Sequence, residues 1–202
     1  MLKVHHLNRS RSTRVLWLLE ELSMPYEIVH HTRDAKTGLA PASLGEIHPL
    51  NKSPILEHND LVICESGAIL EYILDQDAQH RLRPSKDDAT YYRYLEWLHF
   101  AEGSFALPII NSMIMQMDQQ ESSALLKGYV GKELKLDLAY IDDTLSKHTY
   151  FAGNDFTAAD IMMAIMLDYA TNLKLIENRP HISRYISEIH SRPAYQKAMS
   201  LG

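Results

Sequence analysis

The chain has 202 residues, of which 46% are hydrophobic and 23% are charged, and this composition suits one large or two small globular domains rather than a disordered segment. The formal net charge is −6 and the only local basic cluster is the short run Arg9, Arg11 and Arg14, so a nucleic-acid-binding protein is excluded. The single cysteine, Cys64, excludes an intramolecular disulfide and fits the reducing cytoplasm, where we expect the protein to work.

Neither membrane insertion nor secretion is expected. The longest apolar run, residues 161–167, is far too short to span a bilayer. The N-terminal sequence MLKVHHLNRS lacks the apolar segment of a signal peptide. We therefore predict no membrane partner.

The first third of the chain alternates strand-like and helix-like segments. Residues 3–7 are a short strand candidate, and a polar loop follows at residues 8–12. Apolar side chains recur on one helical face over residues 15–22, and Pro25 ends this helix. Residues 26–30 then alternate as a second strand, which completes a β-loop-α-β unit.

A second group of short elements follows a polar stretch. Residues 55–57 and 61–64 form two short strands joined by a turn, and helical spacing returns over residues 68–73. The order β-α-β, loop, β-β-α is that of a thioredoxin-like domain with a mixed four-stranded sheet. We therefore predict an α/β domain of this type over residues 1–76.

The rest of the chain is helical in pattern. Residues 77–88 are polar and lack periodicity, and we interpret them as an interdomain linker. No strand-type alternation appears in residues 89–202, for which we predict an all-α domain. Its expected helices cover residues 89–117 and 123–147, begin at Thr157, cover residues 181–191 and begin again at Pro193.

Three features together resemble the glutathione transferase family. The first is the pair Ser53-Pro54, with Glu65-Ser66 after it. The second is the sequence GNDFTAAD, residues 153–160, in which Thr157 and Asp160 have the spacing of a capping box ahead of an apolar helix. The third is STRVLWLLEELSMPY, residues 12–26. Together they cover nearly the whole chain, and the opening is most similar to a group of bacterial and fungal members.

The resemblance implies a glutathione site in the first domain. In the family this proline is cis, and the main chain of the residue before it pairs with the cysteinyl backbone of glutathione, which assigns Ser53 and Pro54 to the site. Glu65 would balance the γ-glutamyl ammonium. Ser66, as the N-cap of a helix, would leave free N–H groups for the γ-glutamyl carboxylate. The alternative is that Glu65 and Ser66 only cap the helix.

Further anion contacts are expected from neighbouring basic residues. Lys52 and His48 are candidates for the glycyl carboxylate, and Arg11 is a candidate for another anionic group of the ligand. For Arg14 we favour simple solvation.

The chemistry requires a donor that stabilises the glutathione thiolate, because a free thiol has a pKa near 8.5 and is mostly protonated at neutral pH. In the family this donor is Tyr, Ser or Cys near the start of the first helix. Residues 8–12 contain neither Tyr nor Cys, so Ser10 and Ser12 remain as the catalytic candidates. Ser10 lies in the turn itself, whereas Ser12 has helix capping as its alternative role. If neither serves, Asn8 or a backbone N–H is the donor.

The electrophile pocket is expected between the domains, with the first helix of the second domain as its wall. The candidate lining residues are aromatic or aliphatic, and all have core packing as an alternative role: Tyr94, Trp97, Phe100, Phe105 and Ile109.

The remaining reactive side chains are assigned structural roles. Cys64 ends a predicted buried strand, and we interpret it as an inert thiol. The pairs His5-His6 and His30-His31 lack the spacing of zinc ligands, so we interpret them as surface residues at strand ends and expect no metal.

The sequence therefore predicts a detoxifying glutathione transferase that joins the glutathione thiol to small hydrophobic electrophiles, with glutathione as co-substrate. The resemblance also implies a homodimer. One alternative is a glutathione-dependent isomerase, dehalogenase or peroxidase that uses the same site. Another is a non-catalytic module that keeps the fold.

Overall fold

The computed structural model describes residues 1–118 and 121–201, and it divides into two compact units. The first unit consists of Met1–Arg81 and His190–Gly202, and the second consists of Leu82–Ile189. These bounds differ from the expected domains of residues 1–76 and 89–202. Both the start of the expected linker and the last helix of the chain belong to the first unit.

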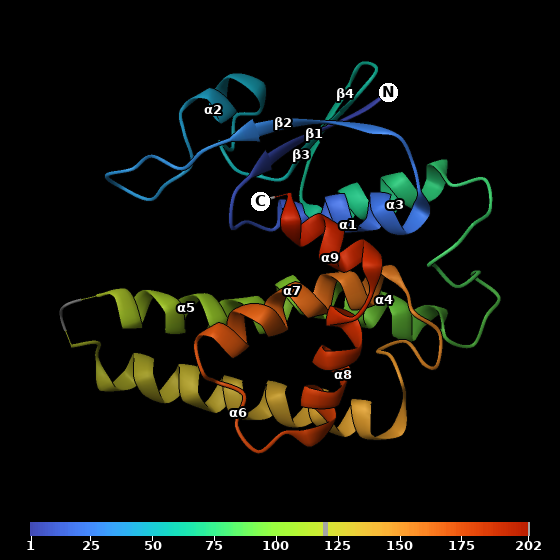
Figure 1. The fold of residues 1–202 in the computed structure, drawn as a ribbon. Helices are drawn as coiled ribbons and strands as arrows, with labels where there is room; N and C mark the ends of the chain where they lie inside the picture. The colour runs from blue at the N-terminus through green and yellow to red at the C-terminus, as the bar shows by residue number, and fades with distance from the viewer. Residues whose placement is uncertain (119–120, 202) are drawn as a thin grey trace. The chain divides into compact units, whose positions relative to one another are not determined.

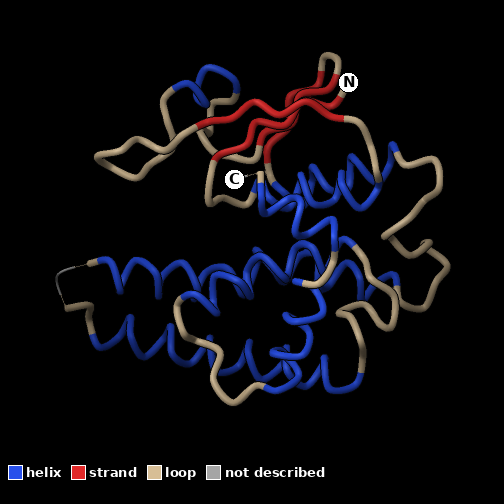
Figure 2. The backbone as a smooth tube through the Cα atoms, viewed as in Figure 1, coloured by secondary structure: helices blue, strands red, loops and turns tan. Residues whose placement is uncertain are grey.

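The first unit is built on a four-stranded mixed sheet (Figure 2). Its strands are β1 (Leu2–Leu7), β2 (Tyr26–His31), β3 (Ile55–His58) and β4 (Leu61–Cys64). Their order across the sheet is β2-β1-β3-β4, with β1 and β2 parallel and the other two pairs antiparallel. This arrangement confirms the predicted thioredoxin-like sheet, and it places β1 in the interior.

Two helices lie together on one side of this sheet (Figure 1), namely α1 (Ser12–Leu22) and α3 (Ser66–Gln76). A short helix that the sequence did not reveal, α2 (Ser43–Ile47), contributes Leu44 to a separate cluster with Leu7 and Ile55. Five residues make little more than one helical turn, too few to display a repeating apolar face.

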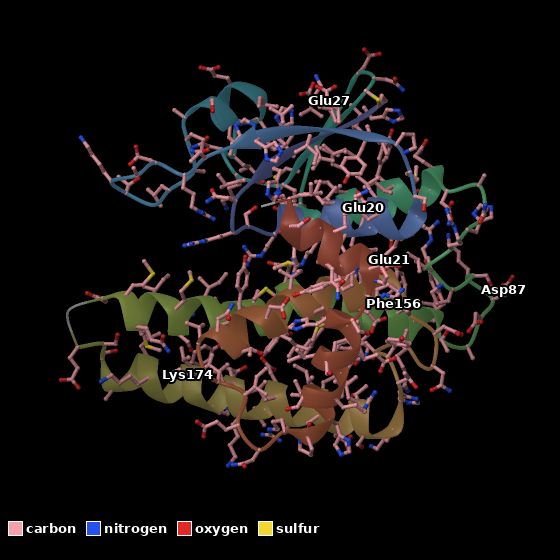
Figure 3. All side chains as sticks on the ribbon, in the orientation of Figure 1. Glu20, Glu21, Glu27, Asp87, Phe156 and Lys174 are labelled. Atoms are coloured by element: carbon pink, nitrogen blue, oxygen red, sulfur yellow. The ribbon has the colours of Figure 1, made fainter. Side chains whose placement is uncertain are left out.

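The last helix, α9 (Pro193–Ser200), packs against α1. The ring of Tyr195 meets the ring of Trp17 edge to face, with centroids 5.1 Å apart. Glu21 accepts a forked pair of hydrogen bonds from Arg192, from Nε at 2.7 Å and from Nη2 at 2.8 Å. Glu20 and Glu21 are adjacent on α1 (Figure 3), and Glu20 pairs with Lys197 at 2.8 Å. These contacts explain why the end of the chain joins the first unit.

Residues 77–81 also belong to the first unit, because Arg81 fixes them there. Its Nη2 donates to the Leu22 carbonyl at 2.9 Å and to Asp77 Oδ1 at 2.8 Å, and its Nε donates to Asp77 Oδ2 at 3.2 Å. The guanidinium lowers the pKa of Asp77 to about 2.

The described residues of the second unit form helices joined by loops, with no strand among them, as predicted. It contains α4 (Tyr91–Phe100), a π-helical turn η1 (Ala101–Phe105), α5 (Ala106–Met117), α6 (Ala124–Lys147), α7 (Ala158–Asn172) and α8 (Pro180–His190). The π-helical turn precedes Pro108, whose ring would clash with the carbonyl four residues earlier, that of Ser104, in a regular α-helix. Across the described ranges, none of the helices is both long enough and apolar enough to cross a membrane.

Helix α7 is the buried centre of the second unit. Its residues 158–167 are all buried, and a capping box joins Thr157 to Asp160 at its start, as the sequence predicted. The fully buried Asp160 carboxylate accepts from Phe151 N at 3.0 Å, from Thr157 N at 2.9 Å, and from the hydroxyls of Thr157 and Tyr185 at 3.0 and 3.2 Å. Burial raises the pKa of Asp160 to about 6, while these four donors act in the opposite direction.

Replacement of Asp160 by Asn tests this arrangement. One carboxylate oxygen becomes an NH₂ group that faces donors, so we expect the free energy of unfolding to fall by about 2–3 kcal/mol, the cost of leaving buried polar groups unsatisfied. Chemical denaturation of the two proteins measures the difference. The exposed neighbour Asp155 provides the matched control, Asp155→Asn, which should change stability little. Equal losses in the two variants would contradict the role of Asp160.

Candidate active site

The turn between β1 and α1 is held by Arg33. Its Nε donates to the Asn8 carbonyl at 3.1 Å and its Nη2 donates to the Arg9 carbonyl at 3.0 Å. The backbone N–H of Arg33 donates to Asn8 Oδ1 at 3.4 Å. Asn8 therefore helps to anchor the turn through its carbonyl and its side-chain oxygen.

Ser12 is the first residue of α1 and not its N-cap, which corrects the capping alternative. The N-cap position is Arg11, whose side chain makes no capping bond. The Ser12 hydroxyl is fully buried and accepts a hydrogen bond from Leu7 N at 3.2 Å. It also lies 2.9 Å from His6 Nδ1 and 2.7 Å from Ser10 Oγ. Its partners thus join the end of β1 to the turn.

Ser10 occupies the turn beside the Ser-Pro sequence. Its hydroxyl accepts from Ser12 N at 3.2 Å and lies 3.5 Å from Ser53 Oγ. Ser53 in turn donates to the His5 carbonyl at 3.0 Å, and the Ser53–Pro54 peptide bond is cis, as the family resemblance implied. The structure therefore brings Ser10, rather than Ser12, next to the predicted peptide-binding residue Ser53.

Arg14 is buried within α1, which corrects the expectation that it is solvated. Its side chain is 0% exposed, and its Nη1 donates to Ser66 Oγ at 3.0 Å. Ser66 is itself buried and is the first residue of α3, so the prediction that it is the N-cap was wrong by one position. The contact joins residues 52 apart in the sequence, a distance at which no local pattern reveals it.

Glu65 occupies the N-cap position of α3 with an unusual backbone. Its φ is 73° and its ψ is 114°, a region that non-glycine residues seldom adopt, and its side chain is exposed. Such a conformation costs about 1–3 kcal/mol and tends to occur at functional sites. The side chain of Glu65 is thereby presented at the start of α3, beside Ser66.

The other predicted anion contacts lie on neighbouring segments of the same unit. Lys52 is exposed and adjoins Ser53, Arg11 is half-buried, and the half-buried His48 accepts at Nδ1 from Leu50 N at 3.3 Å. Their contacts with a ligand stay predictions.

Two histidines of β1 are buried, contrary to the expectation that they lie at the surface. His5 Nδ1 lies 3.0 Å from His31 Nε2, and His5 Nε2 bonds to the carboxylate of Glu57. His6 is only 1% exposed, and burial, together with the electrostatic influence of the neighbouring His30 and His31, lowers its pKa to about 4. Strand alternation over residues 3–7 was the available signal, since it places His6 on the same face as Val4.

The chain matches two family models: Glutathione S-transferase, N-terminal domain, over residues 1–75, and Glutathione S-transferase, C-terminal domain, over residues 105–193. It belongs to the glutathione S-transferase family.

Individual members of the family agree with this assignment. The chain is 35% identical to glutathione S-transferase 3 of Schizosaccharomyces pombe, covering 96% of this chain and 85% of that protein. It is 30% identical to glutathione S-transferase 1 of Saccharomyces cerevisiae, covering 100% and 97%. A crystal structure of a glutathione S-transferase from Actinobacillus pleuropneumoniae matches with a TM-score of 0.88 at 29% identity, covering 100% and 92%. A sphingomonad glutathione S-transferase complexed with glutathione matches with a TM-score of 0.81 at 25% identity, covering 98% of both chains.

The residues predicted to line an electrophile pocket in this transferase mostly pack inside the second unit. Tyr94, Trp97, Phe105 and Ile109 are at most 1% exposed. The Trp97 ring lies 4.6 Å from the ring of Phe151 and stacks on Tyr140 at 4.8 Å. These four residues therefore pack in the core of the second unit, which was their alternative role. Lining of a pocket stays a prediction for Phe100, which is half-buried.

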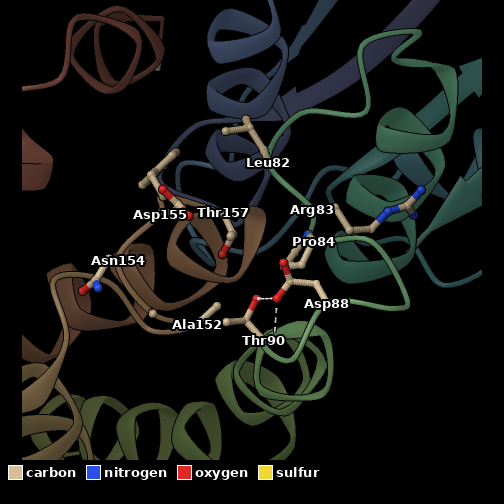
Figure 4. A pocket seen from close by; sticks show the side chains of 11 residues that line it. Leu82, Arg83, Pro84, Asp88, Thr90, Ala152, Asn154, Asp155 and Thr157 are labelled. Carbon is tan, nitrogen blue, oxygen red and sulfur yellow. Dashed lines mark hydrogen bonds between the residues drawn. The ribbon is translucent and has the colours of Figure 1, made fainter.

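A separate pocket lies within the second unit, between residues 82–90 and 152–157 (Figure 4). Its volume is about 190 Å³, below the range of about 300–1,000 Å³ typical of ligand sites. On its wall, Asp88 Oδ1 accepts hydrogen bonds from Thr90 N and Thr90 Oγ1, both at 2.7 Å. These bonds form a turn that leads into α4. None of the predicted glutathione contacts lines it, so we assign it a structural role.

Cys64 is half-buried, and burial raises the pKa of its thiol. The thiol is therefore protonated at neutral pH, which agrees with an inert residue rather than a nucleophile.

The lowered pKa of His6 predicts a specific loss of stability in acid. The unfolded chain protonates this residue near pH 6.5, whereas the folded chain does so near pH 4. The unfolded state thus binds the extra proton between these values, so the free energy of unfolding should fall as the pH falls, by up to about 3 kcal/mol at pH 4, and stay constant above pH 6.5.

The measurement is denaturation at a series of pH values for the wild type and for His6→Asn, which cannot titrate there. We expect the wild type to lose stability relative to this variant across the window. The control is His99→Asn, at an exposed position on α4, whose curve should run parallel to that of the wild type. A parallel curve for His6→Asn would show that His6 titrates normally in the folded protein.

Proposed function

We propose that this chain is a glutathione transferase that holds glutathione on the first unit and adds its thiolate to small hydrophobic electrophiles. The observation that carries the proposal is the double role of the α1 N-terminal region. Just before this helix, Ser10 Oγ lies 3.5 Å from Ser53 Oγ. In its first turn, Arg14 Nη1 donates to Ser66 Oγ at 3.0 Å. The candidate sulfur donor and the candidate γ-glutamyl contact are therefore positioned from one short segment. The named transferases among its relatives add support.

Glutathione binding is proposed to divide among four groups of residues. The main chain of Ser53, ahead of Pro54, pairs with the cysteinyl backbone. Ser66 and the free N–H groups at the start of α3 bind the γ-glutamyl carboxylate, and Glu65 binds the ammonium group. Lys52 and His48 bind the glycyl carboxylate. Arg11 adds positive charge near the anionic ligand.

In the proposed reaction, Ser10 donates a hydrogen bond to the sulfur and stabilises the thiolate, with assistance from the positive end of the α1 dipole. The thiol proton leaves to solvent. In a substitution, a carbon–sulfur bond forms and the leaving group departs with the bonding electron pair. In an addition to an activated double bond, the carbon–sulfur bond forms and a proton is taken up at the neighbouring carbon. We further propose that the protein acts as a homodimer in the cytoplasm.

Replacement of Ser10 by Ala tests the thiolate donor. We expect kcat/KM for conjugation with an activated aryl halide to fall at least tenfold, equivalent to about 1.4 kcal/mol of transition-state stabilisation. Ser10→Thr, which keeps a hydroxyl, should retain more activity. The matched control is Ser187→Ala at an exposed position on α8. Full activity in Ser10→Ala would exclude Ser10 as the donor.

Replacement of Ser66 by Ala tests the binding half of the site. The ligand carboxylate loses a hydrogen bond of the charge-assisted kind, worth about 1.5–3 kcal/mol, so the affinity for glutathione should fall about tenfold or more. Calorimetric titration with glutathione and retention on immobilised glutathione measure the effect. Ser187→Ala should bind like the wild type. Retained affinity in a folded Ser66→Ala protein would place the γ-glutamyl group elsewhere.

A further inference from the structure

The His6 ring and the hydroxyls of Ser12 and Ser10 form a hydrogen-bonded series, and the chemistry of these groups determines which atom donates in each bond. The series runs from His6 Nδ1 to Ser12 Oγ at 2.9 Å, and from there to Ser10 Oγ at 2.7 Å. A hydroxyl has one proton and two acceptor lone pairs, and a neutral imidazole has one N–H and one bare nitrogen. The position of the proton on His6 therefore decides which atom donates and which accepts in every bond of this hydrogen-bonded series.

His6 is neutral, and within the described part of the chain only one of its two ring nitrogens lies near an acceptor for a proton. Burial lowers its pKa to about 4, so at neutral pH the ring carries a single N–H. Its Nε2 is buried and has no hydrogen-bond partner among residues 1–118 and 121–201. A proton there would be an orphaned donor, at a cost of about 1–3 kcal/mol, whereas a proton on Nδ1 is donated to Ser12. The geometry thus favours the Nδ1–H tautomer.

The next two hydroxyls then follow by counting lone pairs. Ser12 Oγ accepts from His6 Nδ1 and from Leu7 N at 3.2 Å, so it must donate its own proton. Ser10 Oγ at 2.7 Å is a closer acceptor than the Leu7 carbonyl at 3.3 Å. Ser10 Oγ thereby accepts from the Ser12 hydroxyl and, at 3.2 Å, from Ser12 N. Both of its lone pairs are occupied.

The proton of Ser10 consequently points away from the buried series. Its nearest acceptor is Ser53 Oγ at 3.5 Å, a separation at which a hydrogen bond between hydroxyls is weak. Ser53 already donates its own proton to the His5 carbonyl at 3.0 Å. The Ser10 proton is therefore held loosely and is available to a stronger acceptor.

We infer that His6 is a positioning residue of the transferase: protonated on Nδ1, it orients the Ser12 and Ser10 hydroxyls so that Ser10 presents its proton to the glutathione sulfur. This inference rests on the proposed role of Ser10. His6 is buried, and the role inferred for it is indirect. It acts through Ser12, and the reversed series, with Ser10 donating inward, would turn a lone pair toward the thiolate.

The first test reads the tautomer in the wild-type protein. The ¹⁵N chemical shifts of the His6 imidazole distinguish a protonated Nδ1 from a protonated Nε2, and assignment follows from loss of the signal in His6→Asn. We expect the Nδ1–H form. A ring protonated on Nε2 would overturn the inference without any need for a variant to fold.

The second test compares two substitutions that differ in one donor. His6→Phe fills the ring volume but cannot donate, whereas in His6→Asn the side-chain amide can donate from close to the position of Nδ1. We expect His6→Phe to lower both kcat and the thiolate fraction of bound glutathione about threefold or more, since cooperative orientation of the series is lost, with little change in KM for glutathione. His6→Asn should restore both quantities.

Ultraviolet titration of the bound thiolate and thermal unfolding accompany the kinetics, because a merely structural role would lower stability without moving the thiol titration. Equal thiolate fractions in wild type and His6→Phe would overturn the inference, provided that Ser10→Ala still lowers the fraction. Equal losses in His6→Phe and His6→Asn would overturn it as well. An unchanged thiolate fraction in Ser10→Ala would instead remove the proposed role of Ser10.

Discussion

The Ser12 hydroxyl in the first unit is shut off from water, so it must find its hydrogen-bond partners inside the protein. Its oxygen bonds Leu7 N at the end of β1 and lies within bonding distance of His6 and Ser10. Leaving such a group unsatisfied costs about 1–3 kcal/mol, so these bonds fix the path of the chain from strand to helix. The turn that contains Ser10 is therefore held from the inside by the buried Ser12 side chain, in addition to the bonds that Arg33 makes to Asn8 and Arg9.

The same helical turn carries the buried Arg14, which bonds Ser66 at the start of α3. Both proposed halves of the glutathione site thus depend on the beginning of α1. A site built on rigid elements holds its geometry more closely than one built on loops, because packing fixes the rotamers of its side chains. The helix is itself held at its other end, where Glu21 accepts the forked bonds of Arg192. Docking of α9 on α1 therefore also supports the helix on which the proposed site depends.

The parts of the fold that short-range patterns encode could be predicted from the sequence. Strand alternation, the Thr157–Asp160 capping box and the apolar face of α1 are short-range patterns, and they predicted the sheet and most of the helices. The Ser53-Pro54 and Glu65-Ser66 pairs were found by resemblance. The burial of individual polar residues could not be predicted, because local patterns assign such residues to the surface. Arg14 and His6 are buried although they are polar: Arg14 donates to Ser66, and His6 Nδ1 lies 2.9 Å from Ser12 Oγ. Hydropathy carries no information about a partner 52 residues away.

The use of serine as the proposed donor explains why such a buried polar arrangement is needed. An alkyl hydroxyl is less acidic than a phenol and donates a weaker hydrogen bond, so a freely rotating serine would stabilise a thiolate poorly. A donor whose direction is set during folding requires no reorganisation when charge develops on the sulfur. In the orientation inferred above, Ser10 meets this condition, because the hydroxyl and the backbone N–H of Ser12 then donate to both of its lone pairs. In the proposed site, a network of neutral groups thus takes the role that the family resemblance gives to a single aromatic hydroxyl in other branches.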